Sequence, residues 1–180
     1  RYQCGPAALA TVLNARGVAV TPETLVTRVY LPARKGSLQA EIVAATRQQG
    51  LLALEIEPAL DALLAEIAAG HPVLVLQNLG LDWLPRWHYA VAIGYDLARQ
   101  ALILRSGTEP RRITPFTVFL NTWDRSARWG MLVLTPGALP AQAGPAAYLE
   151  AASGLEALGK HKEARAAYQA STARWPGALV

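Results

Sequence analysis

The sequence is short of the residues that several classes of protein need. Its 180 residues include one cysteine and three histidines, and only 17% of them are charged. A single cysteine excludes an internal disulfide, and this small Cys/His set makes a structural zinc site unexpected. The formal net charge is +4, without a basic run or basic–aromatic interleaving. We therefore expect no nucleic-acid partner.

Long apolar runs are also missing. No run reaches the roughly 18 residues that a membrane-spanning helix needs, so we expect no span in this chain. The glycines, Gly80 and Gly94 among them, form no phosphate-binding loop. We accordingly expect no cofactor and no metal. What the chain does have is a hydrophobic content of 52%, which predicts a well-filled core for one ordinary domain plus a small appendage.

Helical patterns come first along the chain and β patterns follow. Glycines and caps delimit four expected helices, the third capped by Ser37, at 5–16, 22–30, 38–49 and 59–69. Strands are expected at 51–57, 71–78, 87–96, 101–106 and 129–136, with a short helix at 114–122. This order predicts an α+β fold, with the N-terminal helices packed on one side of an antiparallel sheet.

A segment rich in Pro, Gly and Ala follows the last strand. It predicts a domain at 1–136, a linker at 137–144 and a helical hairpin at 145–180. The hairpin resembles a single tetratricopeptide repeat of about 34 residues, through Tyr148, Ala152, Leu155, Gly159, Ala164, Tyr168 and Pro176. That resemblance implies a protein partner at the hairpin, whereas a generic amphipathic hairpin is the alternative. A single repeat cannot bury its own faces, so we expect it to pack on the main domain or to continue in further repeats.

The only cysteine stands in the stretch RYQCGPAAL, at the start of an Ala-rich helix. The partial positive charge of a helix N-terminus stabilises a thiolate, which is the reactive form of cysteine. Gly5 removes side-chain bulk beside the sulfur and would let a carbonyl group approach. Cys4 is therefore a candidate nucleophile, and an inert, buried small side chain is the alternative.

A thiol nucleophile needs a base, and His88 is the best placed of the three histidines. His161 falls in the turn of the hairpin and His71 at a helix-to-strand junction, both ordinary structural positions. His88 opens a strand and shares a face with Ala90 and Ala92. Such a small-residue face predicts close packing of the Ala-rich first helix, which would bring His88 to the thiol. A core or surface histidine is the alternative.

The stretches QCGPAALATVL and WHYAVAIGYD, in that order, resemble the papain-like C39 peptidase family, which includes the domains that cut leader peptides from bacteriocin precursors. More closely, the chain resembles stand-alone bacterial members with a C-terminal tetratricopeptide repeat. The resemblance implies a papain-like fold over residues 1–136 and peptide or protein substrates. It implies that Cys4 attacks a peptide carbonyl and that His88 holds and donates the proton, as a thiolate–imidazolium pair. It also implies a periplasmic or cell-envelope location in a bacterium.

Two departures from the family pattern bear on activity. The family has an Asp on the strand after the His strand, and alignment through the hairpin puts Ser106 there; we read Asp96, nearer in sequence, as a turn residue. The family's oxyanion donor is a Gln several residues before the Cys, and Gln3 does not match that spacing. The alternatives to a peptidase are a weakened or inactive peptide-binding scaffold on the same fold, and acyl transfer to an amine by the same pair.

Two tryptophans, Trp83 and Trp87, lie just before His88, and five arginines follow in the same region. The tryptophans are candidates for a wall of a substrate groove, with packing in the core or a lid as the alternative. The arginines, which are expected to be mainly solvated, are Arg105, Arg111, Arg112, Arg125 and Arg128.

Overall fold

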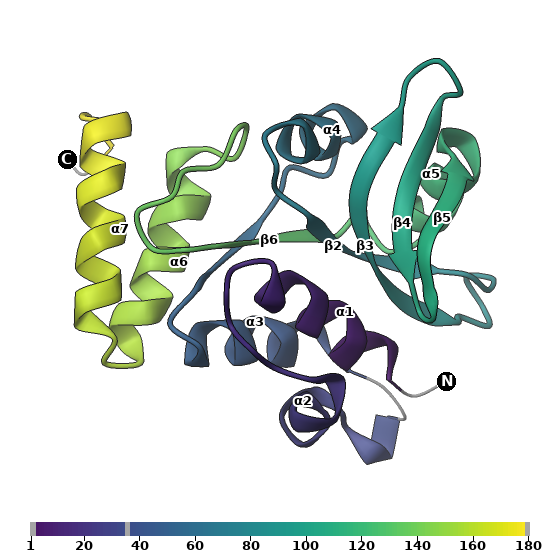
Figure 1. Cartoon of the computed structure of the whole chain (residues 1–180), viewed down its shortest axis with the longest axis horizontal. Helices are drawn as coiled ribbons and strands as arrows, with labels where there is room; N and C mark the ends of the chain where they lie inside the picture. The colour runs from purple at the N-terminus through teal and green to yellow at the C-terminus, as the bar shows by residue number, and fades with distance from the viewer. Residues whose placement is uncertain (1–2, 35–36, 179–180) are drawn as a thin grey trace.

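A computed structural model describes residues 3–34 and 37–178 of the chain (Figure 1). Its helices are α1 (Cys4–Asn14), α2 (Pro22–Val29), α3 (Gln39–Gln48), α4 (Leu60–Ala68), α5 (Phe116–Asp124), α6 (Pro145–Ala157) and α7 (His161–Arg174), with a 3-10 turn at Pro32–Arg34. The strands are β1 (Leu52–Glu55), β2 (Val73–Asn78), β3 (Trp87–Asp96), β4 (Ala101–Ser106), β5 (Glu109–Pro115) and β6 (Gly130–Leu134). The α+β fold expected from the sequence is confirmed.

The six strands form one sheet in the order β1-β6-β2-β3-β4-β5, and every pairing is antiparallel. The last strand in sequence, β6, therefore lies between β1 and β2. Strands β2 to β5 follow one another through short connections, as expected of a meander.

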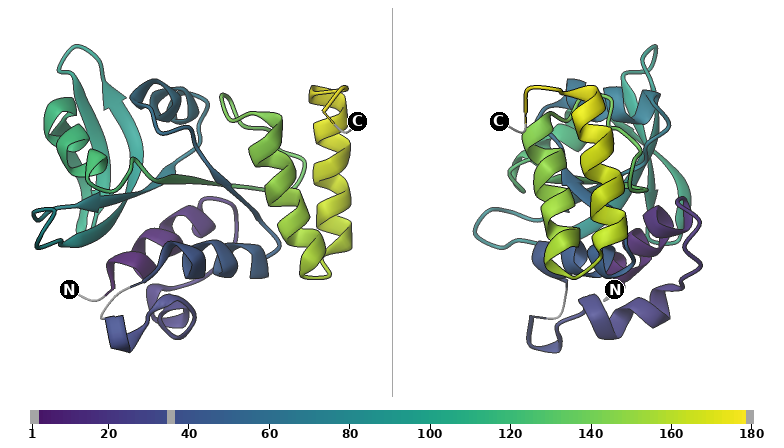
Figure 2. Two further views of the ribbon diagram at one scale, coloured as in Figure 1. Left: turned by 180° about the vertical axis from the view of Figure 1, so that it is seen from behind. Right: turned by 90° about the vertical axis from the view of Figure 1, so that its left-hand side faces the viewer.

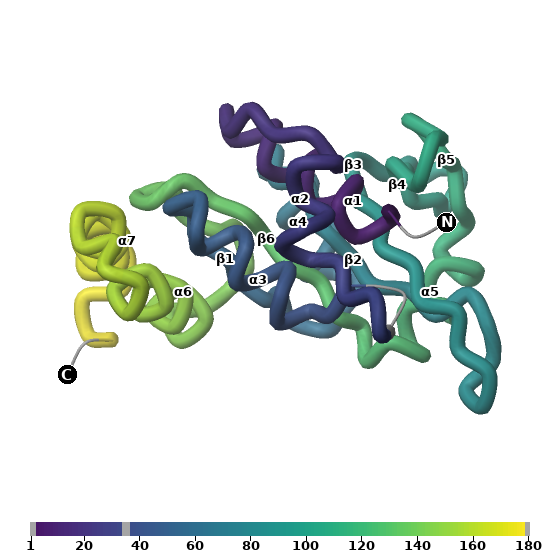
Figure 3. The backbone as a smooth tube through the Cα atoms, turned by 90° about the horizontal axis from the view of Figure 1, so that it is seen from below, coloured from purple at the N-terminus to yellow at the C-terminus, as the bar shows by residue number. Residues whose placement is uncertain are grey.

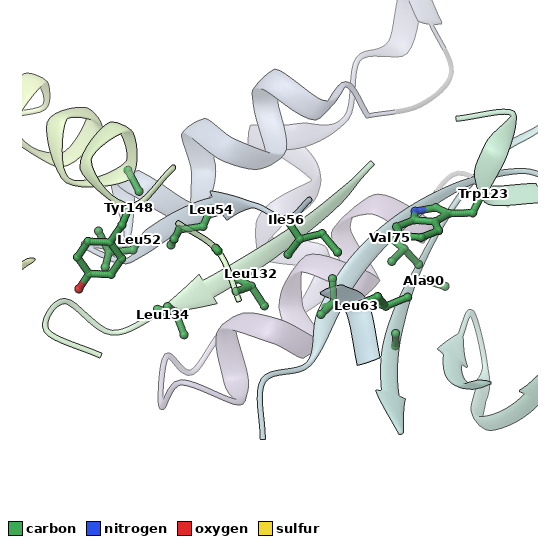
Figure 4. Packing of buried hydrophobic residues seen from close by; sticks show 14 of the residues in the cluster. Leu52, Leu54, Ile56, Leu63, Val75, Ala90, Trp123, Leu132, Leu134 and Tyr148 are labelled. Atoms are coloured by element: carbon green, nitrogen blue, oxygen red, sulfur yellow. The ribbon is translucent and has the colours of Figure 1, made fainter. Parts of the chain in front are cut away.

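Helices cover both faces of this sheet, so the expectation of one covered side is wrong. Successive strand residues point to opposite faces. On one face Leu74 and Val91 share a buried cluster with residues of α1, α2 and α3. Seen from below in Figure 3, these three helices lie in front of the strands. On the other face Val75 and Ala90 share a cluster with α4, α5 and α6 residues, such as Trp123 (Figure 4).

The C-terminal hairpin packs on the sheet. Tyr148 and Leu155 of α6 are fully buried in the same cluster as Leu52 and Leu134 of β1 and β6. The Tyr148 hydroxyl also donates to the carbonyl of Ala138, at 2.8 Å. Figure 2 shows α6 and α7 side by side at one end of the molecule. The division into two domains and the likeness to a tetratricopeptide repeat stay predictions.

Two local expectations differ from the structure. The strand β5 was not expected, because its sequence EPRRITP has prolines near both ends and only Thr114 is buried. It is an edge strand, and the alternation that identifies a half-buried strand is missing there. The third helix has Leu38 as its N-cap residue and no side-chain cap bond, so the cap assigned to Ser37 is wrong.

Candidate active site

Cys4 is the first residue of α1, and Gln3 is the N-cap residue. The first amides of a helix lack an acceptor within the helix, and Pro6 brings no N–H. The unpaired donors at this helix start are therefore the amides of Cys4 and Gly5. The side chain of Cys4 is a free thiol of intermediate exposure that packs against the cluster beneath α1. Its sulfur forms no hydrogen bond with any residue that the structure describes.

Gly5 lets the start of α1 come close to its neighbours. A Cβ atom at this position would lie 2.7 Å from Ser37 Cβ and 3.6 Å from Tyr89 Cδ2. The Tyr89 hydroxyl in turn donates to the Ser37 carbonyl, at 3.1 Å. The beginning of β3, the segment before α3 and the start of α1 thus meet beside Cys4, at the ends of β3 and β4 (Figure 1).

His88 and Ser106 are brought together on neighbouring strands. The Nε2 atom of His88 lies 2.7 Å from Ser106 Oγ, a hydrogen bond between β3 and β4. An irregularity in the β4–β5 pairing falls between Leu104 and Ser106, near the hydroxyl. The other ring nitrogen of His88, Nδ1, has no hydrogen-bond partner among residues 3–34 and 37–178. One side of the imidazole is therefore held, and the other is available.

The face of β3 that meets α1 is not the face expected from the sequence. Tyr89 and Val91 pack with α1, whereas Ala90 and Ala92 pack with the α5 side of the molecule. His88 pairs with Gln77 in the β2–β3 register. It therefore projects from the Ala90 side of the strand at its open end, and Cys4 packs on the side of its neighbour Tyr89.

The surroundings of His88 favour the neutral imidazole. Burial lowers the pKa of His88, and the positive charges of Arg112 and Arg86 lower it further. None of the described carboxylates forms a hydrogen bond with the imidazole ring, which would raise the pKa again. The pKa of Tyr89 is raised, first by burial and then by electrostatic interaction with the ionisable side chains of Cys4 and Glu41, so its hydroxyl stays a donor.

The other two histidines and Asp96 lie outside this site. His71 contacts the buried carboxylate of Glu66, with Nδ1 and Oε1 3.2 Å apart. His161 is the first residue of α7, in the C-terminal hairpin. Asp96 accepts the backbone N–H of Arg99 in the turn after β3, at 3.1 Å, as expected of a turn residue.

Within the described ranges, no group of three or more His, Cys, Asp or Glu residues is arranged to hold a metal ion. The same part of the chain contains no helix of the length and hydrophobicity that crossing a bilayer requires.

Sequence reasoning missed several residues that shape the site. Gln77 is buried opposite His88 and donates to Thr122 Oγ1 of α5, at 2.8 Å. Asn78 is 1% exposed and organises the loop before His88. The polar pair QN at the end of the apolar run VLVL was the available signal, since buried amides need specific partners. Ser37 and Tyr89 carried no comparable signal.

Comparison with known proteins gives a consistent result. The model of the Peptidase_C39 like family matches residues 1–131. A protein from Bacillus anthracis described as a C39-like peptidase superposes with a TM-score of 0.60 at 16% identity, covering 74% of this chain and 88% of that one. The peptidase domain of Streptococcus ComA, described as a bi-functional ABC transporter involved in a quorum sensing pathway, gives 0.57 at 20% identity, covering 74% and 91%. At these identities the two structures show a shared fold.

A third structure, a double glycine motif protease from an AMS/PCAT transporter in complex with the leader peptide, is less similar. Its TM-score is 0.48 at 18% identity, and the match covers 74% of this chain and 84% of that one. No curated protein matches the chain.

Proposed function

Since this chain belongs to the Peptidase_C39 like family, we propose that it is a cysteine peptidase in which Cys4 is the nucleophile and His88 the base. The observation that carries the proposal is the hydrogen bond between His88 Nε2 and Ser106 Oγ. It fixes the ring through one nitrogen and leaves Nδ1 to exchange a proton. Cys4 packs at the start of α1 with the cluster that contains Tyr89, the residue after His88. Because His88 stands at the open end of β3, the proposal requires its ring to reach around the end of the strand toward the thiol.

The reaction proceeds in two halves. The Cys4 thiol transfers its proton to His88 Nδ1 while its sulfur bonds to the carbonyl carbon of the scissile peptide. The helix-start amides of Cys4 and Gly5 are the donors available to the developing oxyanion. The C–N bond then breaks, and the proton moves from His88 to the leaving amine. Water, deprotonated by His88, then bonds to the thioester carbon. The C–S bond breaks, the acyl half leaves as a carboxylic acid, and the proton on His88 returns to the sulfur.

The charge around His88 favours a neutral imidazole at rest over the imidazolium of the ion pair that the family resemblance implies. An imidazolium here is disfavoured by burial and by two guanidinium groups, and Ser106 offers a hydroxyl where a carboxylate would supply charge. Proton transfer then accompanies attack on the carbonyl and does not precede it. We therefore propose a slow peptidase.

The same observation supports the second candidate, an inactive peptide-binding protein on this fold. A hydroxyl can orient a neutral imidazole but does not stabilise its protonated form. If that stabilisation is indispensable, the chain keeps the fold and loses the chemistry. The two candidates differ in whether Cys4 and His88 are chemically coupled.

The test is the pH dependence of Cys4 alkylation by iodoacetamide in the wild-type chain and in His88→Ala, with His161→Ala as the matched histidine control. We expect alkylation to be slower in His88→Ala, by about tenfold or more, and unchanged in His161→Ala. Mass spectrometry reports the labelled fraction directly, because the chain has one cysteine. An alkylation rate that is indifferent to His88 would contradict the peptidase and leave the binding protein.

A further inference from the structure

The loop between β2 and β3 exposes a cluster of large apolar side chains. We call residues 79–87 the tip loop. Five of its side chains are 38–79% exposed: Leu79, Leu81, Trp83, Leu84 and Trp87. Single exposed apolar residues are ordinary, but a contiguous group of them marks an interaction surface.

A buried clamp holds the base of the tip loop in one conformation. The Asn78 Oδ1 atom accepts the backbone N–H groups of Gly80 and Arg86, both at 2.9 Å. The guanidinium of Arg125, from beyond α5, donates to the carbonyls of Asn78 and Gly80. Gly80 has no room for a side chain, since a Cβ would press on the backbone of Leu84. The apolar side chains are therefore presented on a fixed frame.

The tip itself is a tight turn. Leu81 and Leu84 exchange two backbone hydrogen bonds of 3.1 Å, with Asp82 and Trp83 between them. Trp83 is 79% exposed, more than any other large apolar side chain of the tip loop. A rigid aromatic side chain loses little conformational entropy when it is covered, which makes it a typical anchor of an interface.

The tip loop is continuous with the candidate active site. Trp87, its last residue, immediately precedes His88 and pairs with Asn78 in the register. Arg86 and Arg112 both lie within electrostatic reach of the imidazole. Arg86 forms no ion pair within the described part of the chain, and Arg112 has only a distant one, 3.7 Å to Glu109. The region between the apolar tip and His88 thus carries unmatched positive charge.

We propose that the tip loop is the docking surface for the peptide substrate, and that it accepts a segment in which large apolar residues stand beside acidic ones. This inference rests on the proposed function, because it names the substrate class of the same site. The apolar residues of the peptide cover Trp83 and Leu84, and its carboxylates meet Arg86 and Arg112. Asp82, at the tip beside Trp83, argues for a peptide over a lipid bilayer, since its charge would oppose insertion.

The test uses the full chain with Cys4→Ala, so that binding is measured without reaction. The probe is a fluorescein-labelled peptide of leucine and glutamate residues, and its affinity is measured by fluorescence anisotropy. We expect Trp83→Ser and Leu84→Ser each to weaken binding about tenfold or more. Leu97→Ser is the matched control, because Leu97 and Leu84 are both 63% exposed and Leu97 lies in the turn after β3. It should bind as the parent does.

Further arms separate the alternatives. Replacing leucine by serine, or glutamate by lysine, in the peptide should weaken binding to the parent chain. Asn78→Ala should also weaken it, because this variant loosens the frame and keeps the apolar side chains.

Equal losses in Leu84→Ser and Leu97→Ser would overturn the docking surface. It would also be overturned if vesicles of phosphatidylglycerol and phosphatidylcholine shifted the tryptophan fluorescence of the parent chain but not that of Trp83→Ser, while the peptides did not bind. Because these measurements need no thiol, their failure is distinct from failure of the alkylation test.

Discussion

At position 106 a hydroxyl group occupies the place where a carboxylate would stabilise a protonated His88. The hydrogen bond of 2.7 Å shows that this side chain reaches Nε2. Burial and two guanidinium groups lower the pKa of His88, so the imidazolium forms only at pH below its usual range. Ser106 thus orients the imidazole ring, but it does not stabilise a positive charge on it.

Ser106→Asp should restore the missing charge. A carboxylate at Nε2 raises the pKa of His88, which moves formation of the imidazolium to higher pH and stabilises the thiolate beside it. We expect alkylation of Cys4 at mildly acidic pH to accelerate about ten- to a hundredfold. The pH profile of alkylation measures this, with Ser106→Asn as the uncharged control. Equal rates in the Asp and Asn variants would mean that charge at this position does not reach the thiol.

The roles given to Cys4, His88 and Ser106 stay predictions, and the arrangement of the elements around them was only partly predictable. Alignment through the β3–β4 hairpin put Ser106 in the place of the family's Asp, and its hydroxyl does lie at hydrogen-bond distance from His88. The face of β3 that α1 covers was predicted wrongly. Small residues such as Ala90 and Ala92 leave room for large side chains from a neighbouring element as well as for a closely packed helix. Trp123 of α5 packs on the face that carries Ala90 and Ala92. The size of the small residues alone does not tell which helix will pack against them.

At the scale of elements, one buried carboxylate joins α4 to the start of α6. Glu66 is fully buried and accepts the backbone N–H groups of residues 141, 142 and 143, at 2.7–3.2 Å. His71 contacts the same carboxylate. A segment that the sequence presented as a linker is therefore fixed to the main sheet. Nothing in the motif-free stretch around Glu66 indicated this, since its partners are backbone groups far along the chain.

Glu66→Ala should destabilise the protein strongly. It leaves the N–H of the buried Ala143 without its acceptor, whereas water can reach those of the exposed Ala141 and Gln142, so we expect a cost of about 1–3 kcal/mol. Urea unfolding measures the loss, with Asp61→Ala, an exposed position on the same helix, as the control. If both variants lose the same free energy of unfolding, the bonds from Glu66 do not hold the segment.

The elements themselves followed largely from local signals. Thr21 followed by Pro22 predicts an N-cap with proline in the first turn, and α2 begins in this way. Thr24 completes a capping box with Thr21. The exposed edge strand β5 was missed because its side chains face water on both sides. Period-2 patterns arise from burial of one face, so a strand without burial leaves no pattern to read.

At the scale of the whole molecule, the C-terminal hairpin completes the core. Tyr148, Ala152 and Leu155 cover Leu52 and Leu134, which would otherwise face water. The sequence presented the hairpin as an appendage because a segment rich in Pro, Gly and Ala separates it from the last strand. Composition shows where one segment of the chain gives way to another, but it does not predict how much surface the two segments bury against each other.

A chain that ends at residue 144 should therefore be less stable than the full chain. Exposing the β1 and β6 side chains now covered by α6 costs at least about 4 kcal/mol. Thermal unfolding followed by circular dichroism measures the difference, and a second chain that ends at 160 tests whether α6 alone suffices. A truncated chain as stable as the parent would establish residues 1–136 as an independent domain.

The place of β6 in the sheet has a consequence for biosynthesis. β1 pairs only with β6 among the described strands, and β6 also borders β2. Until the ribosome has made residues 130–134, β1 has no partner strand. The hydrophobic cluster between α1 and the sheet then also lacks Met131 and Val133. Cys4 is synthesised well before the β6 residues that complete the cluster against which it packs. A nascent chain therefore carries this thiol before its surroundings exist, and translation itself delays the moment at which the candidate site is complete.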